Sequence, residues 1–276
     1  MILACALFIS AIEAFCGTGI PLSRRREFKL KERSAVHKRM RKEAQRRTNP
    51  LSQKWFRDRQ RHISKSQRAA LRELFPLYGL VVPHGQELSL PLARHHERVV
   101  LDVGFGVGES LVDEASRHPQ DLFVGVEIMK SGIATALKEI AGRGLQNVRV
   151  VRCDATRVFR QLPVNSIDEV LVGFPDPWLA ERDAGRRMLR DDSLLQLHRC
   201  LRVGGKVVVR TDVSAYADYV RSLFASPMHR GQWEKTADLQ YAPACSPGER
   251  ATSKYELRAE AGSIVHDLTF QILAQL

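Results

Sequence analysis

Residues 101–111 read LDVGFGVGESL, an apolar strand end followed by three glycines and by the start of a helical pattern. Glycines in such a turn let the backbone approach a ligand closely. Their GxGxG spacing differs from the GxxG ending of nicotinamide-binding turns, and an acid, Asp102, precedes them. A carboxylate there suits the amino group of a cationic ligand better than a diphosphate. We therefore expect Gly104, Gly106 and Gly108 to bind a positively charged small molecule.

Short apolar segments alternate with amphipathic ones on the C-terminal side of this turn. Such segments are typical of strands buried on both faces of a parallel sheet. The pattern predicts an α/β fold with an open, doubly wound, mostly parallel sheet, whose ligands bind beyond the carboxyl ends of the strands. The predicted strands are 98–103, 122–127, 147–152, 167–173, 206–210 and 268–273, and the predicted helices are 108–117, 130–141, 191–202 and 214–225. A further helix is expected to begin near Ser66, with Ser64 or Ser66 as its N-cap and Pro76 near its end.

Two more acids follow the next two predicted strands. Glu127 closes FVGVE, 25 residues after Asp102, where a carboxylate meets the ribose hydroxyls of an adenosine in several cofactor classes. Asp154 follows VRVVRC and is placed to accept from the amine of an adenine. One ligand, an adenosine that carries a sulfonium, explains all three acids, although any one of them alone fits a solvated helix cap.

The fourth strand ends in the sequence FPDPW, residues 174–178. Two prolines fix φ near −65° and stiffen the turn, so Asp176 is held towards the site and Trp178 offers a flat surface. We interpret this turn as a preorganised platform for a base. The alternative is a rigid loop with a buried tryptophan.

At this point the chain resembles a known family, the bacterial-type tRNA (guanine-N7)-methyltransferases. The resemblance rests on the order and spacing of LDVGFGVGESL, FVGVE, NVRVVRCDA, FPDPW, LRVGGKVVVRTDVSAYADYV and SKYELR, and it extends from about residue 57 to the C-terminus. It implies a class I S-adenosylmethionine-dependent methyltransferase fold, Rossmann-like, with S-adenosylmethionine as cofactor and tRNA as partner. It also implies transfer of a methyl group to N7 of a guanosine, the variable loop being the expected position.

The resemblance further implies roles for individual residues. Methyl-donor binding falls to Asp102, Glu127, Asp154 and Asp176, and Asp176 is also the expected catalytic residue. Substrate contacts are implied for Asp212, Ser253, Lys254, Tyr255 and Glu256. From their charge and aromatic character, we expect further RNA contacts from Trp178, Arg182, Arg186 and Arg187.

The chain also departs from the family pattern. After FPDPW the family usually continues with Pro-Lys and then a His and a Lys, where this chain has Leu179, Ala180, Asp183 and Gly185. Ala180 cannot make the contact of a lysine. Three alternatives therefore stay open: a methyltransferase for another RNA nitrogen, a catalytically silent RNA-binding relative, and a nicotinamide-dependent dehydrogenase. The last is disfavoured by the glycine spacing and by the lack of an obvious His or Tyr-Lys acid-base set.

Basic residues are concentrated near the N-terminus. The chain of 276 residues has a net charge of +12, and residues 24–73 hold 19 Lys or Arg against 5 Asp or Glu. We expect an apolar leader over 1–23, a basic, flexible arm over 24–62 that binds a polyanion, and the methyltransferase domain over 63–276. A solvated or targeting segment is the alternative interpretation of the arm.

The apolar run at residues 2–15 is shorter than the ~20 residues that cross a bilayer, so no membrane anchor is expected. It is either a targeting peptide or sequence upstream of the true start codon. We expect a soluble protein of the bacterial cytoplasm, or of a plastid stroma if residues 1–50 are a leader, and a monomer is compatible with the sequence. The five cysteines form no CxxC pair, and His95-His96-Glu97 lacks a distant partner, so neither a disulfide framework nor a metal is expected.

Overall fold

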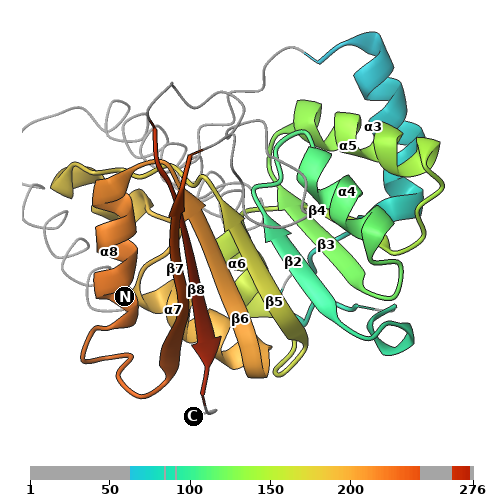
Figure 1. Ribbon diagram of the computed structural model, residues 1–276. Helices are drawn as coiled ribbons and strands as arrows, with labels where there is room; N and C mark the ends of the chain where they lie inside the picture. Colours follow the sequence, from blue (N-terminus) through green and yellow to red (C-terminus); the bar gives the residue numbers. More distant parts are fainter. Residues whose placement is uncertain (1–62, 84, 91, 243–262, 274–276) are drawn as a thin grey trace, which may run out of the picture. The chain divides into compact units, whose positions relative to one another are not determined.

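The alternating segments form one eight-stranded sheet. The computed structural model describes residues 63–83, 85–90, 92–242 and 263–273, all of which belong to one unit spanning residues 50–276. The strand order is β1-β4-β3-β2-β5-β6-β8-β7 (Figure 1). The pairings among β1 to β6 are all parallel, and β8 runs antiparallel to both of its neighbours, β6 and β7. The predicted mostly parallel, doubly wound sheet is therefore confirmed.

Most elements lie close to their predicted positions. The strands are β1 (Gly79–Leu80), β2 (Val99–Val103), β3 (Leu122–Glu127), β4 (Val148–Arg152), β5 (Ile167–Gly173), β6 (Leu201–Thr211), β7 (Trp233–Tyr241) and β8 (Val265–Ile272). The α-helices are α3 (Lys65–Tyr78), α4 (Glu109–Arg117), α5 (Lys130–Gly142), α6 (Ala155–Gln161), α7 (Asp191–Cys200) and α8 (Ser214–Phe224). Two short 3-10 helices, η1 (Ala93–His95) and η2 (Glu181–Arg186), complete the described elements.

Helices cover both faces of the sheet, and the buried side chains form two separate core clusters. Successive side chains of a strand point to opposite faces, and in β2 Val100 contributes to one cluster while Val99 and Leu101 contribute to the other. The Val100 cluster packs against α3, α4 and α5, and the other cluster packs against α6, α7 and α8. This double burial explains why the strands of the sheet centre are almost wholly apolar.

The chain reverses its direction of travel across the sheet between β2 and β5. From β2 it proceeds outward through β3 to β4, and then it returns to β5 and β6 on the other side of β2. Strands β2 and β5 are direct parallel neighbours, with Asp102 paired to Leu171. Ligands of open α/β sheets bind beyond the carboxyl ends of the strands at such a switch point. The segments that follow β2 and β5 are therefore the expected place for a ligand.

Some details differ from the predictions. Helix α3 begins after a capping box formed by Ser64 and Gln67, and it continues past Pro76 to Tyr78. A proline so near the end of a helix removes only one backbone hydrogen bond, so the last turn survives. Helix α7 ends at Cys200, two residues before the predicted end, because Leu201 already pairs with Ile167 of β5. The predicted leader and basic arm lie outside the described residues.

No helix among the described residues is long and apolar enough to span a membrane.

Candidate active site

The glycine-rich turn after β2 has the open backbone surface that its sequence predicts. Gly104, Gly106 and Gly108 have φ values of 76°, 63° and 89°, a region that side chains other than glycine rarely adopt. A Cβ atom built on Gly104 or Gly106 meets no other atom within 4 Å. The backbone of this turn is therefore accessible to a ligand from the carboxyl edge of the sheet.

Asp102 is a buried carboxyl group at this edge. It lies on β2 with only 8% of its surface exposed. Burial raises the pKa of its carboxyl to about 7, against the opposing effect of the Arg210 guanidinium, while the negative charges of Glu127 and Glu114 raise it further. A carboxylate held in this way gains stability from a cationic ligand, because the ligand replaces the hydration that burial removes.

Glu127, the last residue of β3, connects two loops of the site. Its Oε2 accepts the backbone N–H of Gly106 at 3.0 Å, and its Oε1 accepts those of Ile128 at 2.6 Å and Met129 at 2.9 Å. The carboxylate thus fixes the glycine-rich turn against the loop that starts α5. It lies at the carboxyl edge, one strand away from Asp102.

The structure gives Asp154 a structural role. It is the N-cap of α6, a helix that the sequence analysis did not predict, and its Oδ1 accepts from the Thr156 N–H and hydroxyl at 3.0 and 2.6 Å. The helix-cap alternative for this residue is therefore present in the structure. Because β4 neighbours β3, Asp154 still follows the strand next to the one that ends in Glu127.

The FPDPW turn after β5 is strained at both ends. Phe174 and Trp178 have φ values of 48° and 41°, although neither is a glycine. Residues in such conformations persist only where the surroundings fix them, and they cluster at functional sites. The Phe174 N–H donates to the Arg210 carbonyl at 2.8 Å, which fastens the start of the turn to β6. Between the strained positions Asp176 is exposed, as a group that contacts a substrate has to be.

The arginines after this turn have different environments. Arg182 is exposed, with 88% of its side chain accessible, and its Nε lies 3.7 Å from Asp183. Arg186 pairs with Asp183 at 3.0 Å and stacks over the Trp178 ring at 4.1 Å. Arg187 instead turns inward and donates to backbone carbonyls of the FPDPW segment. The three arginines that were predicted to contact RNA are therefore not equivalent.

An ion pair that the sequence analysis missed lies next to the buried aspartate. Arg210 of β6 donates from Nε to Asp267 Oδ2 of β8 at 2.7 Å, and both side chains are largely buried. Arg210 pairs with Gly173 of β5, two residues beyond the partner of Asp102, so Arg210 and Asp102 lie on the same face of the sheet. A charged residue inside the apolar strand VVVRT was the available signal.

Of the predicted substrate residues, Asp212 alone lies in the described part of the chain. It follows β6 directly and is exposed at the carboxyl edge. Ser253, Lys254, Tyr255 and Glu256 lie outside the described residues. Among the residues that are described, no group of three or more His, Cys, Asp or Glu side chains could hold a metal ion.

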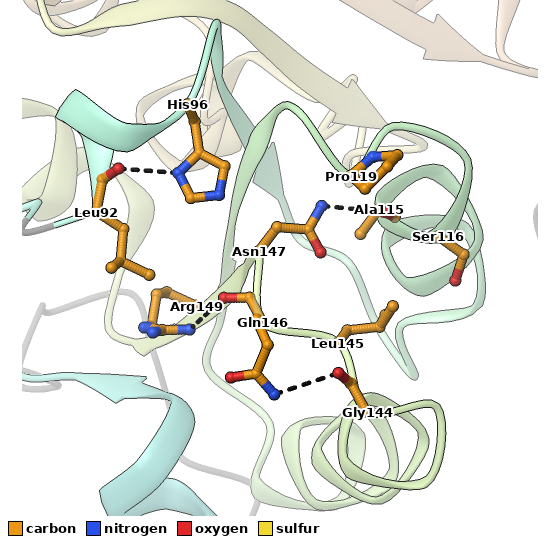
Figure 2. Close-up of a pocket in the computed structure, with 10 residues that line it drawn as sticks. All are labelled: Leu92, His96, Ala115, Ser116, Pro119, Gly144, Leu145, Gln146, Asn147 and Arg149. Atoms are coloured by element: carbon orange, nitrogen blue, oxygen red, sulfur yellow. Dashed lines mark hydrogen bonds between the residues drawn. The ribbon is translucent and has the colours of Figure 1, made fainter.

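A separate hollow of about 430 Å³ lies at the opposite edge of the sheet (Figure 2). Its lining includes His96, Pro119 and Asn147, which precede β2, β3 and β4 respectively. The Asn147 amide donates to the carbonyls of Ala115, His118 and Asp121, so this polar side chain holds the wall together. The hollow contains none of the predicted site residues. The candidate active site is therefore the open carboxyl edge at the switch point.

The chain is similar to known methyltransferases over most of its length. A family model described as "Putative methyltransferase" matches residues 96–265. A tRNA (guanine-N(7)-)-methyltransferase of Pseudomonas syringae pv. syringae is 35% identical over 213 residues, covering 76% of this chain and 85% of that protein. The enzyme of the same name from Hydrogenovibrio crunogenus is 33% identical over 215 residues, covering 77% and 88%.

Two solved structures with similar folds are 16S rRNA methyltransferases. The 16S rRNA methyltransferase KamB superposes with a TM-score of 0.50 at 20% identity, covering 68% of this chain and 96% of that one. A variant of the 16S rRNA (adenine(1408)-N(1))-methyltransferase from Catenulisporales acidiphilia, solved with cosubstrate SAM, gives 0.50 at 19% identity, covering 71% and 97%. These likenesses show the class I fold. The sequence matches show that the chain belongs to the tRNA (guanine-N(7)-)-methyltransferase family.

Proposed function

We propose that this protein transfers a methyl group from S-adenosylmethionine to N7 of a guanosine in tRNA. The observation that carries the proposal is the arrangement at the switch point. Strand β2 carries the buried Asp102 and is followed by the open glycine-rich turn, and its neighbour β5 is followed by the strained turn that carries the exposed Asp176. The family membership gives the substrate class. The variable loop is the part of tRNA that we propose as the target.

The residues of the carboxyl edge fit S-adenosylmethionine. The buried Asp102 carboxylate favours a cationic amino acid moiety, and the turn at Gly104 and Gly106 leaves room for it beside the backbone. Glu127 would accept from the ribose hydroxyls, and Asp154 would meet the adenine. When bound, the cofactor supplies an electrophilic methyl group on a sulfonium.

Methyl transfer to N7 requires no proton transfer by the protein. Guanine N7 has an in-plane lone pair and no proton, so no general base is required, and catalysis rests on positioning. The purine becomes cationic as its new bond forms. A carboxylate fixed beside it, as we propose for Asp176, stabilises charge that grows towards the transition state.

The tRNA would be held by stacking and by phosphate contacts. Trp178, already stacked with Arg186, is proposed as the surface on which an exposed base stacks. The exposed Arg182 is proposed as a phosphate contact, with Asp212 and the SKYE segment at 253–256 on the same substrate. We propose that the basic residues of 24–62 add further phosphate contacts. Under this proposal the protein works in a compartment that contains tRNA, the bacterial cytoplasm or, where residues 1–50 act as a leader, a plastid stroma.

The substrate class is tested by offering the full chain labelled S-adenosylmethionine with unmodified tRNA, ribosomal RNA or duplex DNA. The proposal expects label in tRNA, and much less in the other two. Label in ribosomal RNA alone would assign the protein to another RNA substrate. Tight tRNA binding without any label would assign it to the silent RNA-binding relatives.

A further inference from the structure

Arg187 lies directly beneath the turn that carries Asp176. It follows η2, and its half-buried side chain folds back towards residues 177–179. Its Nε donates to the carbonyls of Pro177 at 3.3 Å and Trp178 at 3.1 Å, and its Nη2 donates to the carbonyl of Leu179 at 3.4 Å. One guanidinium thus binds three consecutive carbonyls immediately after Asp176.

The same guanidinium also contacts an aromatic side chain of helix α8. It stacks over the ring of Tyr219 at 4.1 Å, and that tyrosine, on α8, donates its hydroxyl to the Leu189 carbonyl at 2.9 Å. A planar guanidinium can stack on an aromatic face and still donate in its own plane, which an ammonium cannot do in the same way. Arg187 therefore connects the exposed turn to a packed helix.

The turn needs such a connection because of its backbone. Phe174 and Trp178 both have left-handed φ values, and a strained conformation of this kind persists only where contacts over-determine it. The backbone carbonyl of Arg210 holds the start of the turn by accepting the Phe174 N–H, and the side chain of Arg187 holds its end by donating to the Trp178 carbonyl. Asp176 stands between these two fastenings.

We propose that Arg187 is a positioning residue for Asp176 and Trp178, and that it acts through the turn carbonyls and not as a phosphate ligand. The inference rests on the proposed function for its kinetic part only. An arginine that contacted phosphate would direct its donors outward, as the exposed Arg182 does. Its loss would change RNA affinity, whereas loss of a positioning residue changes the rate of the bound complex, because a shift of about 1 Å can cost ~10²-fold.

The first test compares Arg187→Gln with two matched losses of one positive charge in the full chain, Arg182→Gln and Arg230→Gln. Arg230 is exposed in the turn between α8 and β7, outside the site. We expect Arg187→Gln to lower kcat at saturating tRNA by ~10-fold or more, with the KM for tRNA and the salt dependence of tRNA binding unchanged. Arg182→Gln should weaken binding and flatten its salt dependence, and Arg230→Gln should alter neither quantity. A raised KM with a flatter salt response and an unchanged kcat in Arg187→Gln would overturn the proposal.

A second variant leaves the charge in place. Tyr219→Leu keeps Arg187 but removes the ring beneath its guanidinium, and we expect the same direction of change in kcat. In addition, Arg187→Gln placed on Asp176→Asn should lower kcat no further than Asp176→Asn alone, because both changes act on one group. Full additivity, or wild-type kcat in Tyr219→Leu, would contradict positioning through the turn.

A third measurement does not depend on methyl transfer. Amide hydrogen exchange should become faster at the residues of 174–180 other than the two prolines in Arg187→Gln, while α5, which the substitution does not touch, keeps its wild-type protection. Unchanged exchange in 174–180 would overturn the positioning role of Arg187 even if the enzyme is active. If the wild type does not methylate tRNA but exchange changes as expected, the proposed function fails, whereas the structural role of Arg187 in holding the turn is supported.

Discussion

The Glu127 carboxylate accepts the backbone N–H of Gly106 at 3.0 Å. The last residue of β3 therefore holds the glycine-rich turn that follows β2. The other oxygen of the same carboxylate accepts the N–H groups of Ile128 and Met129. One side chain therefore shapes both walls of the proposed cofactor site. A carboxylate suits this role because both of its oxygens only accept.

Glu127→Gln should weaken binding of S-adenosylmethionine by ~10- to 100-fold. Glutamine replaces one acceptor oxygen with an NH₂ group, which cannot accept from the backbone N–H groups that face it. Each hydrogen bond to a charged group that is lost in this way contributes ~1.5–3 kcal/mol. Calorimetric titration of the full chain measures the effect. Glu234→Gln, at an exposed position of β7, is the control and should bind as the wild type does. Equal affinity of Glu127→Gln and wild type would remove Glu127 from the cofactor site.

Cofactor binding should depend on pH through Asp102. Burial raises the pKa of this carboxyl to about 7, and only its ionised form attracts a cationic amino group. Binding therefore strengthens as the pH rises through 7 and weakens ~10-fold between pH 8 and pH 6. Affinity measured across this range reports the titration, and the curve is compared with that of a variant that cannot ionise at this position, because the cofactor's own amino group loses its proton at about pH 8.

Asp102→Asn is the control for that titration. It keeps the size of the side chain but cannot ionise, so its affinity should be low and nearly constant between pH 6 and pH 8. A wild-type affinity that is also constant over this range would show that Asp102 does not bind the charged group.

Helix α5 should tolerate no side chain at Gly132. A Cβ atom built there lies 2.0 Å from the Gly106 carbonyl oxygen, a backbone atom of the glycine-rich turn. Gly132→Ala should lower the free energy of unfolding by ~1–3 kcal/mol and weaken cofactor binding, because the turn has to move. Gly142→Ala, on the same helix with no atom within 4 Å of the new Cβ, should be neutral or slightly stabilising. Thermal unfolding measures the stability of the two variants, and calorimetry measures their affinity for the cofactor. A Gly132→Ala protein as stable as Gly142→Ala would show that α5 and the glycine-rich turn do not pack as described.

The sheet was predictable because burial on both faces leaves a continuous apolar signature. The strand at 122–127 and that at 167–173 have their predicted bounds, and helix α5 ends one residue later than predicted. The positions of Asp102 and Glu127 at neighbouring strand ends follow from the same periodicity. Chain order and strand length therefore determine most of the candidate site.

Features that depend on contacts distant in sequence were not predictable. Helix α6 has only seven residues directly after a strand, so its periodicity is too short to detect. Strand β7 has mostly exposed or half-exposed residues and owes its conformation to pairing with β8. The inward direction of Arg187 and the pairing of Arg210 with Asp267 arise from partners 8 to 57 residues away. Local sequence does not distinguish such arginines from exposed ones.

The basic arm should make tRNA binding steeply dependent on salt. If the full chain neutralises six or more phosphates, its affinity for tRNA falls by at least ~10³-fold between 50 and 200 mM salt. A chain that begins at residue 63, before the Ser64 cap of α3, should show a clearly smaller slope of log Kd against log salt. Filter binding at several salt concentrations compares the two proteins. Identical slopes would exclude the arm from tRNA binding.

Asp176→Asn should lower turnover by ~10²-fold or more at saturating cofactor and tRNA. The substitution keeps the shape of the side chain but removes the charge that we propose to stabilise the cationic purine, a contribution of a few kcal/mol. Single-turnover methyl transfer measures the chemical step directly. Wild-type rates in this variant would refute the proposed role of Asp176.

The most direct test of the whole account is the identity of the methylated nucleoside. Unmodified tRNA is reacted with S-adenosylmethionine and the full chain, digested to nucleosides and analysed by mass spectrometry beside an Asp176→Asn control. We expect N7-methylguanosine with the wild type and very little with the variant. A different methylated nucleoside, or no methylated nucleoside from the wild type, would contradict the account.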